Sequence, residues 1–522
     1  MVLNFVLKNR FYDSVLLMQI ASQAKEQSGV EKVSVLMGTA SNKALMKETS
    51  ILAEGGEQAG PNDLVIAVVA DQEEACSGAF EKVLELLEKR EVKKSDTSYA
   101  PRTIARALDE IGGANIALIS LPGPFVRHEA QKALQAGLNL MIFSDNVPLA
   151  DEIALKQMAH DRGLLVMGPD CGTAIIKGKA LGFANVVRPG PVGIVGASGT
   201  GIQEITVLLE QQGIGISHAI GTGSKDLSQE VDAITMLDGM SVLQHDRGTS
   251  VIVLVSKPPD RKVAAKVVKA AKKLGKPVVI CFIRGEGEKV SGNRIESAST
   301  LEETVGKTAA IVTGKPLNQS PFQEDFEKIQ KKSEGAAKAL PEERVFIRGL
   351  YSGGTLCEEA LVILHELLGE VYSNTNVYPP QKLEDARKSQ AHTLVDLGDD
   401  EFTRGTPHPM IDYTLRKERL MEEAAREDVA VILMDVVLGY GSHADPAGEL
   451  LPLILKVKER EGAPVFVISL CGTEGDPQNL RRQKSIFEEA GVFVLPSNAQ
   501  AARFAALVAS RGRASEKLLQ AT

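Results

Sequence analysis

The chain has 522 residues, 43% apolar and 24% charged, which is enough apolar material for about three or four globular domains. The 47 glycines, 4% aromatics and lack of Trp favour an α/β protein, and the composition excludes a disordered polymer, a collagen-like fibre and a disulfide-stapled miniprotein. With a net charge of −9, few aromatics and no long basic block, the chain is not expected to bind nucleic acid or an anionic membrane.

The cysteine pattern and the N-terminus indicate the compartment. Cys76, Cys171, Cys281, Cys357 and Cys471 are scattered and form no CxxC pair, which favours a reducing environment over a disulfide framework or a zinc site. The apolar run at the N-terminus is too short for a signal peptide, and no stretch nears the ~18 residues of a membrane span. We therefore expect a cytoplasmic protein without a metal site.

Residues 1–95 alternate short β-rich runs with helical stretches, which predicts a small α+β module. The predicted strands are Val2–Leu7, Lys32–Met37 and Leu64–Ala70, and the predicted helices are Ser14–Gln27, Asn42–Ala53 and Glu73–Glu88. The charged stretch from Glu88 to Ser98 has no core pattern, so we interpret it as a linker.

Residues 100–188 and 189–315 repeat a strand–helix–strand pattern that predicts parallel sheets covered by helices. The first of these regions has predicted strands at Asn115–Ser120, Leu138–Ser144 and Leu164–Met167 and helices at His128–Ala136 and Ala150–Arg162. The second has predicted strands at Gly193–Gly196, Ile214–Ala219, Val251–Val255 and Pro277–Phe282.

Residues 316–344 are polar and form the predicted linker to a last unit, residues 345–512. This unit has a predicted helix at Leu356–Leu367 and strands at Val345–Gly349, Thr393–Leu397, Ala430–Asp435, Pro464–Leu470 and Gly491–Leu495. Its order of strand, Ser/Gly/Thr loop and helix matches residues 189–315, which predicts two flavodoxin-like domains related by an approximate two-fold.

Two Ser/Gly/Thr loops lie where a predicted strand runs into a predicted helix. Free amides and the positive end of a helix can hold a phosphate there, and glycines let the backbone approach closely. The alternative is that Ser and Thr only cap the helices. We expect the helices that begin near Thr200 and Thr355 to converge on one phosphate or carbamoyl-phosphate site. The phosphate-binding candidates are Ser198, Gly199, Thr200, Gly201, Ser352, Gly353, Gly354 and Thr355.

Further candidates follow other predicted strands, because ligands of open α/β sheets bind at the carboxyl ends of the strands. An Asp in such a turn can equally be a helix cap, an unpaired Cys is usually structural, and a lone loop His is usually solvated. The substrate-binding candidates are Gly221, Thr222, Gly223, Asp226, Gly398, Asp399, Cys471, Gly472 and Thr473, and the catalytic candidates are Asp170, Cys171 and His443.

Several motifs together resemble a known family. Leu121-Pro-Gly-Pro-Phe-Val-Arg-His, Met167-Gly-Pro-Asp-Cys-Gly and Pro191-Val-Gly-Ile-Val-Gly-Ala-Ser-Gly-Thr resemble the α subunit of succinyl-CoA synthetase over residues 103–315. Ser352-Gly-Gly-Thr and Val395-Asp-Leu-Gly resemble the carboxy-terminal domain of its β subunit. This fusion behind a small α+β module is similar to the FdrA family. The resemblance implies a partial Rossmann-like CoA-binding-type domain at 100–188 and ligase-type domains at 189–315 and 345–512.

The chain departs from the synthetase at each step of the ligase reaction. The loop Arg284–Arg294 has no histidine to carry phosphate, and the glutamate expected near Val255–Lys257 to orient it is absent. The glycine loop for CoA phosphates has no match before Thr103, and the ATP-grasp half of the β subunit is missing. We therefore expect no phosphohistidine, and no cofactor is certain, with CoA binding left open.

The resemblance to the FdrA family implies a function that needs only phosphate sites. It implies a subunit of an oxamate carbamoyltransferase in allantoin breakdown, which interconverts oxalurate and phosphate with oxamate and carbamoyl phosphate. The alternatives are a nucleotide-dependent acyl-CoA synthetase and a non-catalytic scaffold that binds an anion. The expected partners are a small-molecule anion, other carbamoyltransferase subunits and further copies of the chain.

Overall fold

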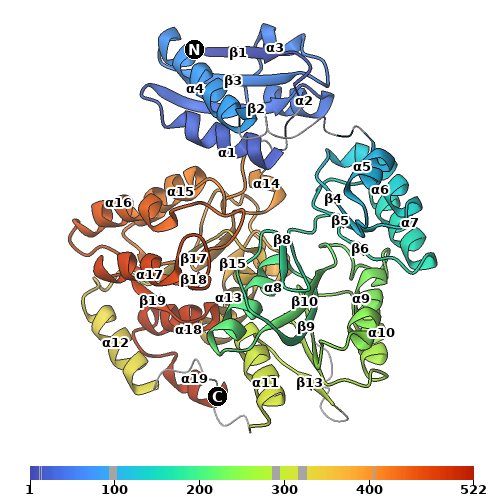
Figure 1. The fold of residues 1–522 in the computed structure, drawn as a ribbon. Coiled ribbons are helices and arrows are strands. Elements are labelled where there is room, and N and C mark those ends of the chain that lie inside the picture. Colours follow the sequence, from blue (N-terminus) through green and yellow to red (C-terminus); the bar gives the residue numbers. More distant parts are fainter. Residues whose placement is uncertain are drawn as a thin grey trace. The chain divides into compact units, whose positions relative to one another are not determined.

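The computed structural model describes residues 1–10, 12, 14–92, 101, 103–284, 294–315, 326–403 and 406–521. The chain divides into two compact units, one formed by Met1–Ala114 with Asp399–Asp412 and the other by Asn115–Gly398 with Tyr413–Thr522 (Figure 1). Among the described residues, no helix is both long and apolar enough to cross a membrane.

The first unit is built on a three-stranded antiparallel sheet of order β1-β3-β2, which confirms the α+β module. Its elements are β1 (Val2–Leu7), α1 (Ser14–Lys25), β2 (Val30–Met37), α2 (Ala40–Glu48), α3 (Glu54–Glu57), β3 (Leu64–Ala70), α4 (Glu73–Val92), α5 (Ile104–Ile111) and α14 (Asp400–Thr403). The central strand β3 is apolar throughout because both of its faces are buried. Leu64, Ile66 and Val68 pack under α1 and α4, and Val65 and Ala67 pack on the opposite side with α2.

The second unit begins with a small parallel sheet of order β4-β5-β6. Its elements are β4 (Ile116–Ile119), α6 (Gly123–Gln135), β5 (Asn139–Ile142), α7 (Leu149–Asp161) and β6 (Val166–Met167). The alternation of strands and helices matches the partial Rossmann-like region expected at residues 100–188.

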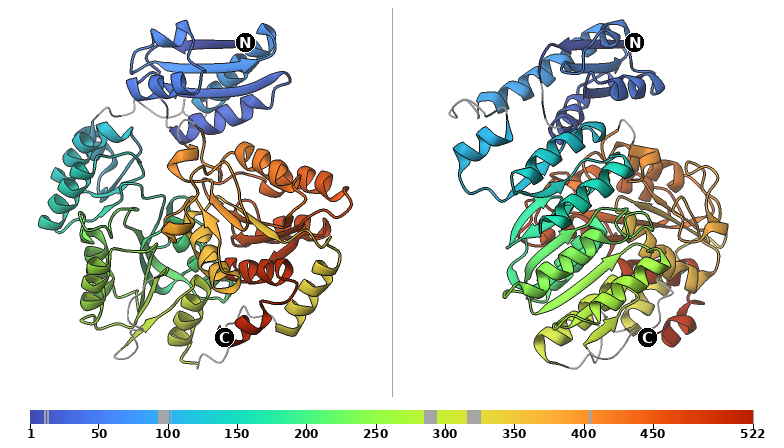
Figure 2. Two further views of the ribbon diagram at one scale, coloured as in Figure 1. Left: turned by 180° about the vertical axis from the view of Figure 1, so that it is seen from behind. Right: turned by 90° about the vertical axis from the view of Figure 1, so that its right-hand side faces the viewer.

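Next comes a seven-stranded sheet of order β13-β12-β11-β9-β10-β7-β8. Its elements are β7 (Thr173–Ile176), β8 (Lys179–Gly182), β9 (Pro189–Ala197), α8 (Gly199–Gln211), β10 (Ile216–Gly221), α9 (Ile234–His245), β11 (Val251–Ser256), α10 (Arg261–Ala271), β12 (Val278–Phe282), β13 (Ile295–Ser297) and α11 (Leu301–Thr313). The five strands β9 to β13 are parallel and have the flavodoxin-like order. Helices α9 and α10 cover one face, and α8 and α11 cover the other (Figures 1 and 2).

The hairpin β7–β8 is a difference from the sequence prediction. The sequence predicts no strand between Leu164–Met167 and Gly193–Gly196, but Thr173 and Ala174 begin a strand that pairs antiparallel with β10. Each strand of the hairpin is only four residues long, so the alternation of apolar and polar residues is too short to indicate a strand.

The last sheet has the order β15-β16-β14-β17-β18-β19. Its elements are β14 (Phe346–Tyr351), α13 (Gly354–Leu368), β15 (Tyr372–Ser373), η1 (Pro379–Gln381), β16 (Thr393–Asp396), α15 (Thr414–Ala424), β17 (Val429–Val437), α16 (Pro446–Lys458), β18 (Val465–Cys471), α17 (Leu480–Glu489), β19 (Phe493–Leu495), α18 (Asn498–Ala509) and α19 (Ser515–Ala521). Without the two-residue edge strand β15, the order is again flavodoxin-like.

The helices α8 and α11 of one lobe pack against α13 and α18 of the other. Each lobe also caps a helix of its neighbour through a buried glutamate. Glu359 on α13 accepts from the Leu301 amide at the start of α11 (2.7 Å), and Glu204 on α8 accepts from the Asn498 amide at the start of α18 (3.1 Å). This exchange relates the two lobes as a pseudo-symmetric pair, as the matched sequence order predicted.

The predicted linker at residues 316–344 is wrong for part of its length. Helix α12 (Phe326–Lys338) lies within it and packs on α18. Ile329, Ser333 and Ala337 are buried at four-residue spacing, so one narrow face of an otherwise polar helix makes the contact. Residues 316–325 lie outside the described residues.

Candidate functional site

The two Ser/Gly/Thr loops lie at the carboxyl ends of the central strands β9 and β14 and meet each other. Ser198 Oγ and Thr355 Oγ1 are 2.7 Å apart in a buried hydrogen bond. A Cβ added to Gly353 would lie 2.9 Å from Thr200 Cγ2, so the glycine allows the close approach of the two helix starts. The eight phosphate-binding candidates are thus gathered in one place, and their binding of phosphate stays a prediction.

The start of α13 already holds an internal carboxylate. Asp435 accepts from the amides of Ser352 (2.8 Å) and Gly353 (2.7 Å) and from the Ser352 hydroxyl (3.1 Å to each oxygen). The fully buried guanidinium of Arg416 also donates to it (3.1 Å). Because Asp435 takes the donors that a phosphate would need, the second loop is closed to an external anion unless this carboxylate moves.

At the start of α8, in contrast, no carboxylate of the described residues takes the first backbone amides. Ser198 caps the helix by accepting from the Gly201 amide (3.0 Å). The amides of Gly199 and Thr200 have no acceptor within the part of the chain that the structure describes, and both residues are half-buried. Two free amides at a helix N-terminus favour an anion. Of the two loops, this one is therefore the candidate anion site.

Three charged residues beside these loops were missed at the sequence level. Lys257 follows β11, its ammonium lies 3.6 Å from Glu358 Oε1, and a Cβ on Gly354 would be 2.6 Å from the same nitrogen. Asp396 Oδ2 would be 2.4 Å from that Cβ. Burial opposes the charged form of Lys257, but Glu358 and Asp396 outweigh it and raise the pKa of this lysine. The position of Lys257 directly after a parallel strand was the available signal.

Cys171, a catalytic candidate from the sequence, is poorly suited to act as a nucleophile. Its side chain is buried, with 2% of the residue exposed, and burial raises the pKa of its thiol to about 12. The thiol packs in the turn before β7, where a Cβ on Gly221 would lie 2.6 Å from Cys171 Sγ. Asp170, in contrast, is exposed and close enough to Lys257 to influence its pKa. Of these two candidates, only Asp170 is both exposed and near Lys257.

Gly223, Thr222 and Asp226 have bonding partners inside the protein. A Cβ on Gly223 would lie 2.1 Å from Pro169 O, and the Thr222 amide donates to Gly196 O (2.9 Å). Asp226 is fully buried, where it binds Lys156 (2.8 Å) and accepts from the first amides of α9, those of Thr235 (3.1 Å) and Met236 (2.9 Å). A substrate would have to displace these contacts, so the geometry assigns the turn to packing and helix capping.

The candidates near the end of β18 join the two lobes. The Thr473 hydroxyl donates to Val186 O (2.8 Å), and its amide donates to Asp476 (2.8 Å). Gly472 O accepts from Gln211 (3.4 Å). Cys471 is buried, and burial raises the pKa of its thiol well above its usual value, which disfavours the reactive thiolate.

The remaining candidates lie on turns. The Gly398 amide donates to Asp396 (2.9 Å), and exposed Asp399 accepts from the Glu401 amide (3.0 Å) in the first turn of α14. His443 Nδ1 accepts from the Asp445 amide (3.2 Å), and its ring lies edge-on to Tyr413, 5.5 Å between centroids. These contacts favour the helix-cap alternative for Asp399 and a structural position for His443.

Comparisons with known proteins define the class of this α/β chain. A CoA-ligase family model matches residues 350–508, a CoA binding domain model matches residues 187–284, and a model described as "AllF, heavy metal-associated domain" matches residues 1–102. The protein is thus an assembly of CoA-ligase-type domains behind an AllF-type N-terminal domain.

The particular family follows from a relative of similar length. The uncharacterized protein YahF of Escherichia coli K12 is 42% identical over 94% of this chain and 95% of its own, so the chain belongs to the YahF family. An α subunit of succinate–CoA ligase from Archaeoglobus fulgidus is 29% identical over 32% of this chain and 58% of that subunit. The malate–CoA ligase α subunit of Methylorubrum extorquens is 26% identical over 38% of this chain and 69% of that subunit.

The N-terminal domain does not have the residues of a soft-metal site, although its family description refers to heavy metals. Such sites use cysteine thiolates and histidines, and residues 1–102 contain one cysteine and no histidine. That cysteine, Cys76, is fully buried on α4 with its sulfur 4.0 Å from Val68 O. The match therefore describes the fold of this domain.

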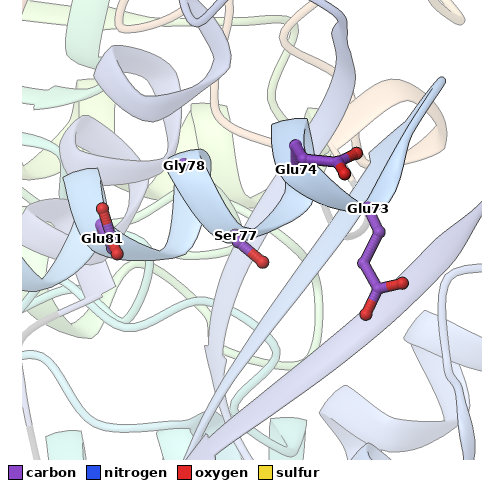
Figure 3. Close-up of a pocket in the computed structure, with 5 residues that line it drawn as sticks. All are labelled: Glu73, Glu74, Ser77, Gly78 and Glu81. Atoms are coloured by element: carbon purple, nitrogen blue, oxygen red, sulfur yellow. The ribbon is translucent and has the colours of Figure 1, made fainter.

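A hollow of about 430 Å³ beside α4 does not change this conclusion. Figure 3 shows its carboxylates spread along the helix rather than gathered at one point. Among the described residues, no group of three or more His, Cys, Asp or Glu side chains is placed to hold a metal ion. The hollow is lined by Glu73, Glu74, Ser77, Gly78 and Glu81.

The start of α8 does not fit CoA. A bound CoA would place a bulky diphosphate and its adenosine at the glycine loop. Here the first turn of α8 is covered by the second lobe, because Thr355 bonds Ser198 and Gly353 packs on Thr200.

Proposed function

We propose that this protein is a subunit of a carbamoyltransferase that interconverts oxalurate and phosphate with oxamate and carbamoyl phosphate. The observation that carries the proposal is the start of α8, where the free amides of Gly199 and Thr200 lie beside the second loop, whose next residue, Gly354, borders the Lys257 ammonium. This arrangement can hold a phosphate without a covalent carrier, and the chain has no histidine between His245 and His365 to serve as one.

The reaction balances without nucleotide or CoA. An oxygen of hydrogenphosphate attacks the terminal carbamoyl carbon of oxalurate, so that a C–O bond forms. The C–N bond to the oxamate nitrogen then breaks, and this nitrogen gains the proton that hydrogenphosphate loses. Helix amides and Lys257 would stabilise the phosphate charge and the tetrahedral oxyanion, which is catalysis by positioning and electrostatics.

The AllF-type N-terminal domain supports this assignment, because the FdrA family that the sequence resembles is implicated in allantoin breakdown. The second candidate is an acyl-CoA synthetase, favoured by the CoA-ligase and CoA binding domain matches. Against the synthetase stand the loop Arg284–Arg294 without histidine and the covered start of α8. Residues 285–293 of that loop lie outside the described residues. We expect further subunits or further copies of the chain to complete the enzyme.

The test is an assay of oxalurate and phosphate with the chain alone and with the products of neighbouring genes. Carbamoyl phosphate should form without added nucleotide or CoA. Turnover that requires CoA and a nucleotide would support the synthetase, and phosphate binding without turnover in any combination would support the scaffold. Lys272→Met, an exposed lysine at the end of α10, serves as a control variant that should keep full activity.

A further inference from the structure

Lys257 and Thr200 lie on either side of one short stretch of the second loop. A Cβ on Gly353 would be 3.0 Å from Thr200 Cβ, and a Cβ on the next residue, Gly354, would be 2.6 Å from Lys257 Nζ. Since consecutive Cα atoms are about 3.8 Å apart, the lysine ammonium and the start of α8 border adjacent residues of the same loop. The Lys257 side chain is 39% exposed, so a small ligand can reach it.

Glu358 adds a polar atom without a partner. It lies one turn into α13, four residues after Gly354, and only 8% of its side chain is exposed. Its Oε1 lies 3.6 Å from Lys257 Nζ, but its buried Oε2 has no hydrogen-bond partner among the described residues. A buried acceptor without a donor is unfavourable, so a ligand that supplies an N–H group would be favoured at this position.

The surrounding charges keep the lysine protonated. Glu358, Asp396, Cys357 and Asp170 are all near enough to Lys257 to act on its charge, and together they raise its pKa despite burial. Burial raises the pKa of Glu358, and Lys257 opposes this shift. The site therefore offers donors for an oxyanion at Lys257 and α8, and an acceptor for an N–H group at Glu358.

We infer that Lys257 and Glu358 select carbamoyl phosphate over other acyl phosphates. Lys257 and the α8 amides would take the phosphate oxygens, and Glu358 Oε2 would accept from the carbamoyl NH₂ group. Acetyl phosphate has nearly the same shape but carries a methyl group in place of NH₂, so it leaves Glu358 unpaired. This inference rests on the proposed function, since it names the residues that would recognise its product.

The experiment compares the affinities of the full chain for freshly prepared carbamoyl phosphate and acetyl phosphate by calorimetry. The wild type should bind carbamoyl phosphate about tenfold more tightly, as expected when one hydrogen bond to a charged group distinguishes two ligands. Lys257→Met should weaken both ligands about tenfold or more, and Lys257→Arg should restore part of the affinity. Glu358→Leu should bring the two affinities close together, and Glu358→Gln, which keeps an acceptor oxygen, should retain part of the preference.

Glu366→Leu, at an exposed position of the same helix, is the matched control and should leave the ratio unchanged. Melting temperatures identify any variant that fails to fold. If one does, Lys257→Arg and Glu358→Gln provide the comparison instead. Equal affinity of the wild type for the two ligands, or an unchanged ratio in both Glu358 variants, would overturn the inference. Neither result would contradict the proposed phosphorolysis of oxalurate. Conversely, a wild type that shows the preference but no phosphorolysis would contradict only the proposed function.

Discussion

Asp435 stabilises the second loop as an internal substitute for an anion. Its carboxylate is fully buried and receives the amides of Ser352 and Gly353 and the guanidinium of Arg416. Removing its charge would leave the arginine charge buried without its partner. We therefore expect Asp435→Asn to lower the free energy of unfolding by about 3 kcal/mol or more, measured by urea denaturation. Asp399→Asn, at an exposed turn, should change it by less than about 0.5 kcal/mol; an equally small effect at Asp435 would contradict this role.

Glu204 and Glu359 make stability depend on pH. Burial is the main cause that raises the pKa of each to about 7, from an ordinary value of 4.5. The charge of Glu302 adds to both shifts, and that of Glu359 adds to the shift at Glu204. Between these two values the folded state binds more protons than the unfolded state, so the free energy of unfolding falls as pH rises from about 4.5 to about 7. Below that window the full stability is present.

Glu359→Gln should remove part of this dependence, because the amide cannot ionise. We expect the fall in unfolding free energy between about pH 5 and pH 7.5 to be smaller in the variant by about 1–3 kcal/mol. Urea denaturation across this range measures it. Glu366→Gln is the exposed control on the same helix and should follow the wild type. Identical pH profiles for Glu359→Gln and the wild type would show that this carboxyl titrates normally.

At the level of single residues, the sequence indicated the two loops but not the side chains that complete the site. The loops were recognisable because Ser, Gly and Thr stand between an apolar strand and a helical stretch. Lys257, Glu358 and Asp396 come from three segments that only the fold brings together, so no local pattern marked them. Cys171 was a candidate from its position alone, and burial of its thiol, which a single sequence does not reveal, rules it out.

At the level of elements, the starts of α8 and α13 fit together through glycines. A Cβ on Gly201 would lie 2.2 Å from Ser198 Oγ and 3.1 Å from Thr355 Cγ2. Gly201→Ala should therefore disturb both the helix cap and the contact between the lobes, lowering stability by about 1–3 kcal/mol and weakening phosphate binding.

Gly335→Ala in α12 is the matched control, since nothing lies within 4 Å of its added Cβ. There, alanine in place of a helical glycine should raise stability by about 0.5–1 kcal/mol. Thermal and urea denaturation of both variants test the contrast. Similar effects of the two substitutions would mean that the start of α8 is not tightly packed.

Most elements followed from apolar periodicity, and the exceptions have physical reasons. The buried strands Val251–Ser256 and Val429–Val437 are short apolar runs rich in Val and Ile, which favours a strand over a helix. The hairpin β7–β8 has strands of only four residues, and α12 buries only one narrow face of a polar sequence. In both cases a tertiary contact, with β10 or with α18, supplies the stability that the local sequence does not indicate.

At the level of the whole molecule, the two flavodoxin-like lobes form one candidate active site, because one lobe supplies the start of α8 and the other the start of α13. The loop Arg284–Arg294 contains no histidine to carry phosphate, so the function we propose uses no covalent carrier and relies on the start of α8 to hold phosphate. Incubation with labelled ATP or carbamoyl phosphate should accordingly leave no acid-labile, alkali-stable label on the protein. Such a label on any histidine would support the acyl-CoA synthetase instead.

Phosphorus NMR of the reverse reaction tests the central claim most directly. The protein, with its neighbouring gene products, is mixed with carbamoyl phosphate and oxamate in the absence of nucleotide and CoA. We predict that the carbamoyl phosphate signal decays faster than its spontaneous hydrolysis, that inorganic phosphate appears in equal amount, and that oxalurate accumulates to match. Decay at the spontaneous rate without oxalurate, together with turnover once a nucleotide and CoA are supplied, would contradict a phosphate-dependent carbamoyl transfer.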